Sequence, residues 1–92
     1  MLRFTWDPAK AERNVRKHGV SFPEASSVFG DRLAIDIDDP VHSDDEPRFV
    51  ILGNSDRRQL LVVVYAARRI DEIRIISARR AAPRERRNYE EP

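Results

Sequence analysis

The most constraining feature of this chain is an apolar run without a polar face, Leu60-Leu61-Val62-Val63-Val64. A strand that is exposed on one side alternates apolar and polar residues. An uninterrupted run therefore predicts a strand that is buried on both faces, at the centre of a sheet. The rest of the 92 residues must supply cover for both faces of this strand. That length allows one small domain, and no repeat or linker divides it, so we expect a single domain over residues 1–92.

Periodicity and turn residues predict three helices and five strands along the chain. The expected strands are residues 4–6, 33–38, 48–53, 60–67 and 72–79, and the expected helices are 8–18, 22–29 and 83–89. The order β-α-α-β-β-β-β-α predicts an α+β domain with a largely antiparallel sheet, two N-terminal helices and one C-terminal helix.

The ends of the first two helices carry recognisable capping signals. Asp7 should cap the first helix, and Gly19 should end it in the left-handed conformation. Ala11 and Val15 should face inward from this helix. Residues 21–24 form a capping box, which should open the second helix.

Charge is unevenly distributed along the chain. Of the 17 basic residues only Lys10 and Lys17 are lysine, and the others are arginine, whose planar fork matches phosphate oxygens. Residues 36–46 contain only acidic charges, whereas residues 48–92 carry an excess of arginine. This asymmetry predicts a basic face for an anionic partner, with a generally solvated surface as the alternative.

Several compartments and chemistries are disfavoured by composition. Without cysteine, the chain cannot form disulfides, thiolate metal sites or a Cys nucleophile. No apolar stretch approaches transmembrane length and the start does not look like a signal peptide, so we expect a cytoplasmic protein with no membrane contact.

Lys17 and His18 stand at the end of the first helix. A helix C-terminus favours the protonated imidazole, and histidine titrates near neutrality, so both are candidates for proton transfer or phosphate contact. The alternative, which the sequence alone favours, is a C-terminal cap in which both side chains satisfy free carbonyls.

Arginines stand at the ends of three expected strands, at Arg48, Arg68 and Arg79. Because alternate residues of a strand share a face, Arg79 should lie with Ser77 and Ile75. With Tyr65 and Tyr89, the arginines could bind a phosphodiester and stack on bases. The alternative is that they only solvate the sheet edges, and the residues leave both interpretations open.

Metal binding has weak support. His42 with Asp44, Asp45 and Glu46 offers nitrogen and oxygen ligands, but their spacing matches neither an EF-hand nor a zinc site. The chain has no Gly-rich phosphate loop, nucleophile elbow or His-Glu-x-x-His motif. We therefore expect no metal and no cofactor. Acid–base and electrostatic chemistry by Arg, Lys, His, Glu and Tyr remains, a set suited to RNA cleavage through the 2′-hydroxyl.

Four short motifs are spread over nearly the whole chain: Phe4-x-Trp6-Asp7, Asn14-x-x-Lys17-His18-Gly19, Arg74-Ile75-Ile76-Ser77-Ala78-Arg79 and Glu85-Arg86-x-x-Tyr89. In combination they resemble the BrnT toxins. The resemblance implies a RelE-like fold and ribonuclease activity in a bacterial type II toxin–antitoxin pair. It also implies a BrnA-like ribbon-helix-helix antitoxin, which forms a hetero-oligomer with the toxin and carries it to operator DNA.

The resulting hypothesis is a metal-independent endoribonuclease, in which 2′-hydroxyl attack gives a cyclic phosphate. Phosphate would be held by Arg79, Arg48 and Arg68, and protons would be transferred by His18 or Lys17, with Glu46 as a base. RNA would also contact Tyr65, Tyr89, Arg74 and Arg80. One rival is an inactive BrnT-like module that only binds its antitoxin and DNA. Another is a direct DNA binder that uses residues 84–87.

Overall fold

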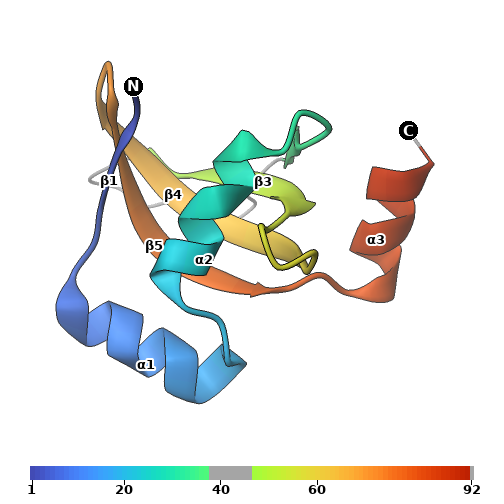
Figure 1. Ribbon diagram of the computed structural model, residues 1–92, viewed down its shortest axis with the longest axis horizontal. Coiled ribbons are helices and arrows are strands. Elements are labelled where there is room, and N and C mark those ends of the chain that lie inside the picture. The colour runs from blue at the N-terminus through green and yellow to red at the C-terminus, as the bar shows by residue number, and fades with distance from the viewer. Residues whose placement is uncertain (38–46, 92) are drawn as a thin grey trace.

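A computed structural model describes residues 1–37 and 47–91, which form one sheet with helices on one face and a last helix beyond its end (Figure 1). In chain order the elements are β1 (Arg3–Thr5), α1 (Pro8–His18), α2 (Phe22–Ser26), the 3-10 helix η1 (Ser27–Gly30), β2 (Ile35–Ile37), β3 (Phe49–Asn54), β4 (Leu60–Arg69), β5 (Glu72–Arg80) and α3 (Pro83–Glu90).

The predicted α+β class and the largely antiparallel sheet are confirmed. The strand order is β1-β5-β4-β3-β2, and only the β1–β5 pair is parallel. The apolar run lies in β4, at the centre of the sheet, as expected. Leu61 and Val63 pack beneath α2 and η1, whereas Val62 packs with Leu52 on the opposite face. We call this opposite face, turned away from α2 and η1, the far face.

A β-bulge in β5 overturns one prediction about the strand faces. Val64 pairs with Ser77, but its neighbour Tyr65 pairs with Ile75, so Ile76 is an extra residue that faces no partner. Ile75 lies in the helix-covered core, whereas Ser77 and Arg79, paired with Val64 and Val62, lie on the far face. The expectation that Arg79 shares a face with Ile75 was wrong, because the bulge reverses the alternation between them.

The inward face of α1 also differs from the prediction. Ala11 packs against the core as expected, but Val15 is 47% exposed, and Asn14 is buried at 7% exposed instead. The Asn14 amide nitrogen donates to the carbonyls of Ala78 and Val20 at 2.8 and 2.9 Å, and its oxygen accepts from the Ala78 N–H at 3.1 Å. This part of β5 lies beyond the last β1 pair, so its edge needs hydrogen-bond partners rather than an apolar side chain.

The helix ends follow the capping signals closely. Asp7 accepts from the Ala9 N–H at 2.9 Å, and Gly19 ends α1 at a φ of 70°. Ser21 caps α2 as expected, but the Glu24 carboxylate accepts from Ser55 and Gln59 in the β3–β4 turn. The second helix ends earlier than expected and continues as η1.

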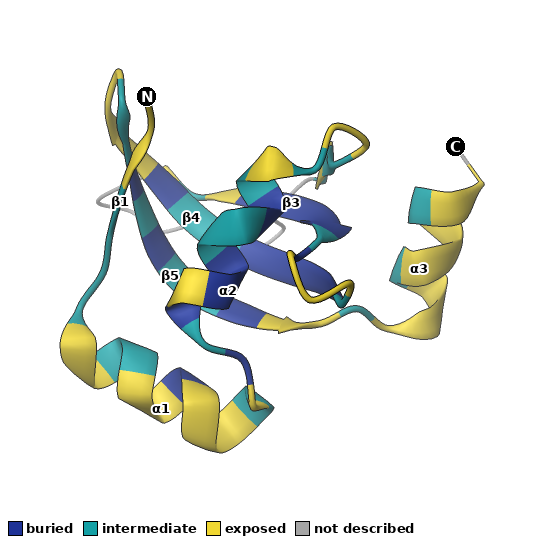
Figure 2. Cartoon of the chain, viewed as in Figure 1, coloured by how far each residue is buried: buried dark blue, intermediate teal, exposed yellow. Residues whose placement is uncertain are grey.

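Helix α3 is the least buried element, with no buried residue along its length (Figure 2). Its C-terminal half is held at the end of the sheet by Tyr89. The Tyr89 hydroxyl donates to Asp31 at 2.6 Å and accepts from the Asn54 amide at 3.2 Å. The bond to Asp31 raises the pKa of Tyr89 above its ordinary value.

The observed strand limits differ slightly from the predicted ones. Strand β2 is shorter than expected, with Leu33 exposed before it and residue 38 outside the described residues. Arg48 lies just before β3 rather than in it. Among the described residues, no helix is long and apolar enough to cross a membrane.

Candidate functional site

The largest concentration of predicted site residues is a pocket between α1 and the far face. It has a volume of about 420 Å³ and is lined by Lys10, Arg13, Asn14, Lys17, His18, Arg48, Ile76 and Ser77. We call it the basic pocket. It brings together three predicted catalytic residues: Lys17 and His18 at the end of α1, and Arg48 just before β3. Its volume is within the range of small-ligand sites.

Two local features give the basic pocket its shape. Residues 10, 14 and 17 follow helical spacing and share one side of α1, and Asn14 fixes that side against Ala78. The bulge at Ile76 turns Ser77 to the far face, where it reaches the pocket. The hydrogen bonds of Asn14 and the bulge at Ile76 thus place the basic side chains of α1 beside β5.

The electrostatics of the basic pocket suit an anionic ligand. Lys10, Arg13, Lys17 and Arg48 are basic, His18 lies beside them, and the lining holds no carboxylate within the described residues. None of these five side chains forms a hydrogen bond or ion pair with another described residue. Lys17 and Arg13 are exposed, and His18 is half-buried. No carboxylate of the described residues pairs with them, so a bound polyanion would relieve their mutual repulsion.

Sequence reasoning missed Lys10 and Arg13. The signal was present, because Lys10 stands seven residues before Lys17 and Arg13 stands four before it, which are neighbouring positions on a helix. Ala11 and Val15 instead predicted a different orientation for this helix.

Arg68 and Arg74 lie elsewhere, in a second pocket of about 300 Å³ with Thr5, Trp6, Asp7 and Glu72. Arg74 points to the far face, two positions before the bulge residue of β5. The sequence placed Arg68 in one groove with Arg48 and Arg79, but of these three arginines only Arg48 lines the basic pocket.

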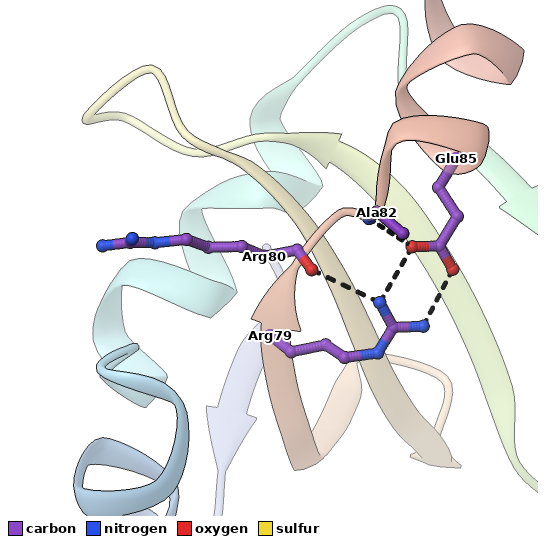
Figure 3. Close-up of polar contacts among 4 residues, drawn as sticks. All are labelled: Arg79, Arg80, Ala82 and Glu85. Carbon is purple, nitrogen blue, oxygen red and sulfur yellow. Dashed lines mark hydrogen bonds and ion pairs between the residues drawn. The ribbon is translucent and has the colours of Figure 1, made fainter.

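Arg79 lies on the far face and is paired with the start of α3. Its Nη1 and Nη2 donate to Oε1 and Oε2 of Glu85, each at 2.8 Å, and Nη1 also donates to the Arg80 carbonyl at 3.3 Å (Figure 3). This pairing raises the pKa of Arg79 and lowers that of Glu85. The Arg80 side chain extends away from Arg79 (Figure 3).

Neither predicted stacking tyrosine lies in the basic pocket. Tyr65 is on the helix-covered face, with ring centroids 4.9 Å from Phe29 and 5.6 Å from Phe49. Its burial, together with the charge of Asp36, raises its pKa. Tyr89 is committed to Asp31 and Asn54.

The possible base Glu46, with the weak metal ligands His42, Asp44 and Asp45, lies outside the described residues. Within residues 1–37 and 47–91, no group of three or more His, Asp or Glu side chains is placed to hold a metal ion.

Comparison with known proteins identifies the family. A family model for BrnT, the ribonuclease toxin of type II toxin–antitoxin systems, matches residues 6–85. The chain belongs to the BrnT toxin family. The match covers all residues of the basic pocket and the Arg79–Glu85 pair. Its description as a ribonuclease toxin implies RNA chemistry and an antitoxin partner.

A solved BrnT structure supports the same conclusion for the fold. The ribonuclease toxin BrnT of Brucella abortus matches with a TM-score of 0.68 and 21% sequence identity. The alignment covers 89% of this chain and 99% of that one. A comparison with curated proteins found no match.

Proposed function

We propose that this BrnT-family protein is an endoribonuclease that cleaves RNA by 2′-hydroxyl attack and needs neither a metal ion nor a cofactor. The observation that carries the proposal is the basic pocket, where five cationic or titratable side chains meet without a carboxylate in the described lining. Permanent cations can hold a phosphodiester and compensate the charge that develops on it, which is the task a metal would otherwise perform.

The reaction would proceed in one displacement at phosphorus. The 2′-oxygen loses its proton and forms a bond to the adjacent phosphorus, and the bond from phosphorus to the 5′-oxygen breaks. The leaving oxygen takes a proton, so the products are a 2′,3′-cyclic phosphate and a free 5′-hydroxyl.

The chain offers a group for each role. Arg48 in the basic pocket, with Arg79 further along β5, would stabilise the charge on the phosphorane. His18 or Lys17 would transfer the proton to the leaving oxygen, and Glu46 remains the proposed base. Arg74 would extend the contact with the RNA strand on the same sheet face. Arg68 would act there as well, beside Arg74 rather than beside Arg48.

The antitoxin would work by covering this basic surface. We propose a ribbon-helix-helix antitoxin of the BrnA type, whose acidic side chains meet the arginines and whose own DNA-binding end connects the complex to operator DNA. The rival is an inactive toxin that keeps only this binding role. It predicts the same complex but no RNA cleavage.

The test is cleavage of a single-stranded RNA in the presence of EDTA, with the product ends identified chemically. Arg48→Ala should slow cleavage by about 10²–10³-fold, the usual cost of losing one charge-stabilising donor. Arg16→Ala is the matched control, because Arg16 lies on α1 and pairs outward with Glu12. Cleavage that stops in EDTA and returns with magnesium would overturn metal independence, and a folded wild-type protein without any cleavage would favour the rival.

A further inference from the structure

Among the described residues, the guanidinium of Arg79 is contacted at Nη1 and Nη2 but not at Nε. An arginine side chain has five N–H donors, which form an end edge (Nη1 and Nη2) and a side edge (Nε and Nη2). Glu85 takes the whole end edge, and the Arg80 carbonyl takes the second hydrogen of Nη1. The Nε–H and one Nη2–H remain, and together they form a second fork. A fork of this kind matches two oxygens of one phosphate.

Glu85 is itself held in place from the backbone. Its Oε1 also accepts the N–H of Ala82, the residue that caps α3, at 2.7 Å (Figure 3). The Glu85 side chain is only 20% exposed, whereas that of Arg79 is 45% exposed. The carboxylate is therefore the fixed partner, and the guanidinium is oriented by it. Without Glu85, only the 3.3 Å bond to the Arg80 carbonyl would orient the Arg79 guanidinium among the described residues.

We propose that Glu85 is a positioning residue, which holds Arg79 so that its Nε/Nη2 edge binds a phosphate of the RNA. The inference rests on the proposed function and adds to it the donor edge and the residue that orients it. Two bonds on the end edge fix the plane of the guanidinium, so the ordering cost is met before RNA binds.

The opposite role for Glu85 makes the opposite prediction. A carboxylate that merely competes with phosphate for Arg79 would inhibit, and its removal would raise activity. Removing any acid beside a polyanion site also strengthens RNA binding on charge alone. A positioning residue must therefore show its effect in kcat rather than in KM.

The decisive variant is Glu85→Gln, because glutamine keeps the Oε1 acceptor for Ala82 but turns an NH₂ group toward Nη2. We expect kcat to fall about tenfold, less than the 10²–10³-fold expected for Arg79→Ala, while KM stays equal or falls. Glu90→Gln is the matched control: it removes the same charge from α3, where the exposed Arg86 is the partner of Glu90 among the described residues. An unchanged or higher kcat in Glu85→Gln overturns the inference.

A double variant separates positioning from folding. In an Arg79→Ala background, Glu85→Gln should have no further effect on kcat, because it acts through the missing side chain. A further drop of the same size would show a role independent of Arg79. If wild type cleaves RNA but Arg79→Ala is fully active, the placement of Arg79 in the site fails. If wild type does not cleave RNA, the proposed function itself fails.

Discussion

Asn14 should contribute more to stability than any apolar residue on the same helix. It is the only buried residue of α1 in the described structure, and its side chain makes three hydrogen bonds between 2.8 and 3.1 Å. Two of these pair with the N–H and C=O of Ala78, as a neighbouring strand would. Replacement by alanine would leave these backbone groups of β5, and the carbonyl of Val20, without partners in a buried region.

The expected loss follows from those bonds. Each net hydrogen bond contributes roughly 1 kcal/mol, so three give about 3 kcal/mol. Alanine is the better helix former, which returns about 0.5 kcal/mol. The net loss for Asn14→Ala is thus roughly 2–3 kcal/mol, a large part of the 5–15 kcal/mol typical of a domain. In urea, where the slope is about 1–3 kcal/mol per molar, the midpoint should fall by roughly 1–3 M.

The matched control is Val15→Ala, the adjacent position that the periodicity assigned to the core. Val15 is 47% exposed, so its replacement should change stability by no more than about 0.5 kcal/mol. Urea unfolding followed by circular dichroism measures both variants. The structural argument is refuted if Val15→Ala costs more than Asn14→Ala.

Three further results are expected. A Cβ on Gly53 would lie 2.9 Å from both Ala34 Cβ and Val28 Cγ1, so Gly53→Ala should lower stability by about 1–3 kcal/mol in thermal unfolding, whereas Gly30→Ala, with no atom within 4 Å, should not. Partial burial alone would raise the pKa of Asp31, but hydrogen bonds from Tyr89 and two backbone N–H groups outweigh it and lower the pKa below 3.8. Ionised Asp31 therefore adds to the free energy of unfolding above that pH, and this contribution is lost as the pH falls through the lowered pKa. Tyr89→Phe should lose less of its unfolding free energy on acidification than wild type, as measured by urea unfolding. An identical pH profile in the two proteins would contradict this. Association with the antitoxin should slow as salt rises while dissociation changes little, and Arg48→Ala should weaken that salt dependence; a salt-insensitive association rate would place the antitoxin on another surface.

The features that were predictable from the sequence are those that nearby residues determine. The central strand followed from an apolar run, and the ends of α1 followed from Asp7 and Gly19. The bulge at Ile76 did not follow, because it depends on how β5 pairs with β4, and the residues of β5 alone are compatible with regular alternation. The burial of Asn14 was hidden for a similar reason, since it is set by a strand edge that lies 64 residues away in the chain.

For the site, composition indicated an arginine-rich surface, but it did not predict which of the basic residues share a pocket. Lys17, His18 and Arg48 line one pocket, whereas Arg68 and Arg79 lie outside it. The Glu85 pairing of Arg79 was not foreseen, because the sequence predicted the start of the last helix but not the direction in which it leaves β5. A charged residue near a helix start reads equally well as a solvated one.

The short first strand leaves open the edge of β5 beside which the basic pocket forms. Strand β1 is three residues long, and its last pair joins Thr5 to Arg74. Had β1 continued, it would have paired with the bulge region of β5 and occupied the edge that Asn14 now satisfies. Because Asp7 instead starts a helix, the chain turns away from the sheet, and α1 returns its cations to that edge. The basic pocket therefore depends on where β1 stops, which is a property of Asp7 and Pro8 rather than of any residue in the pocket.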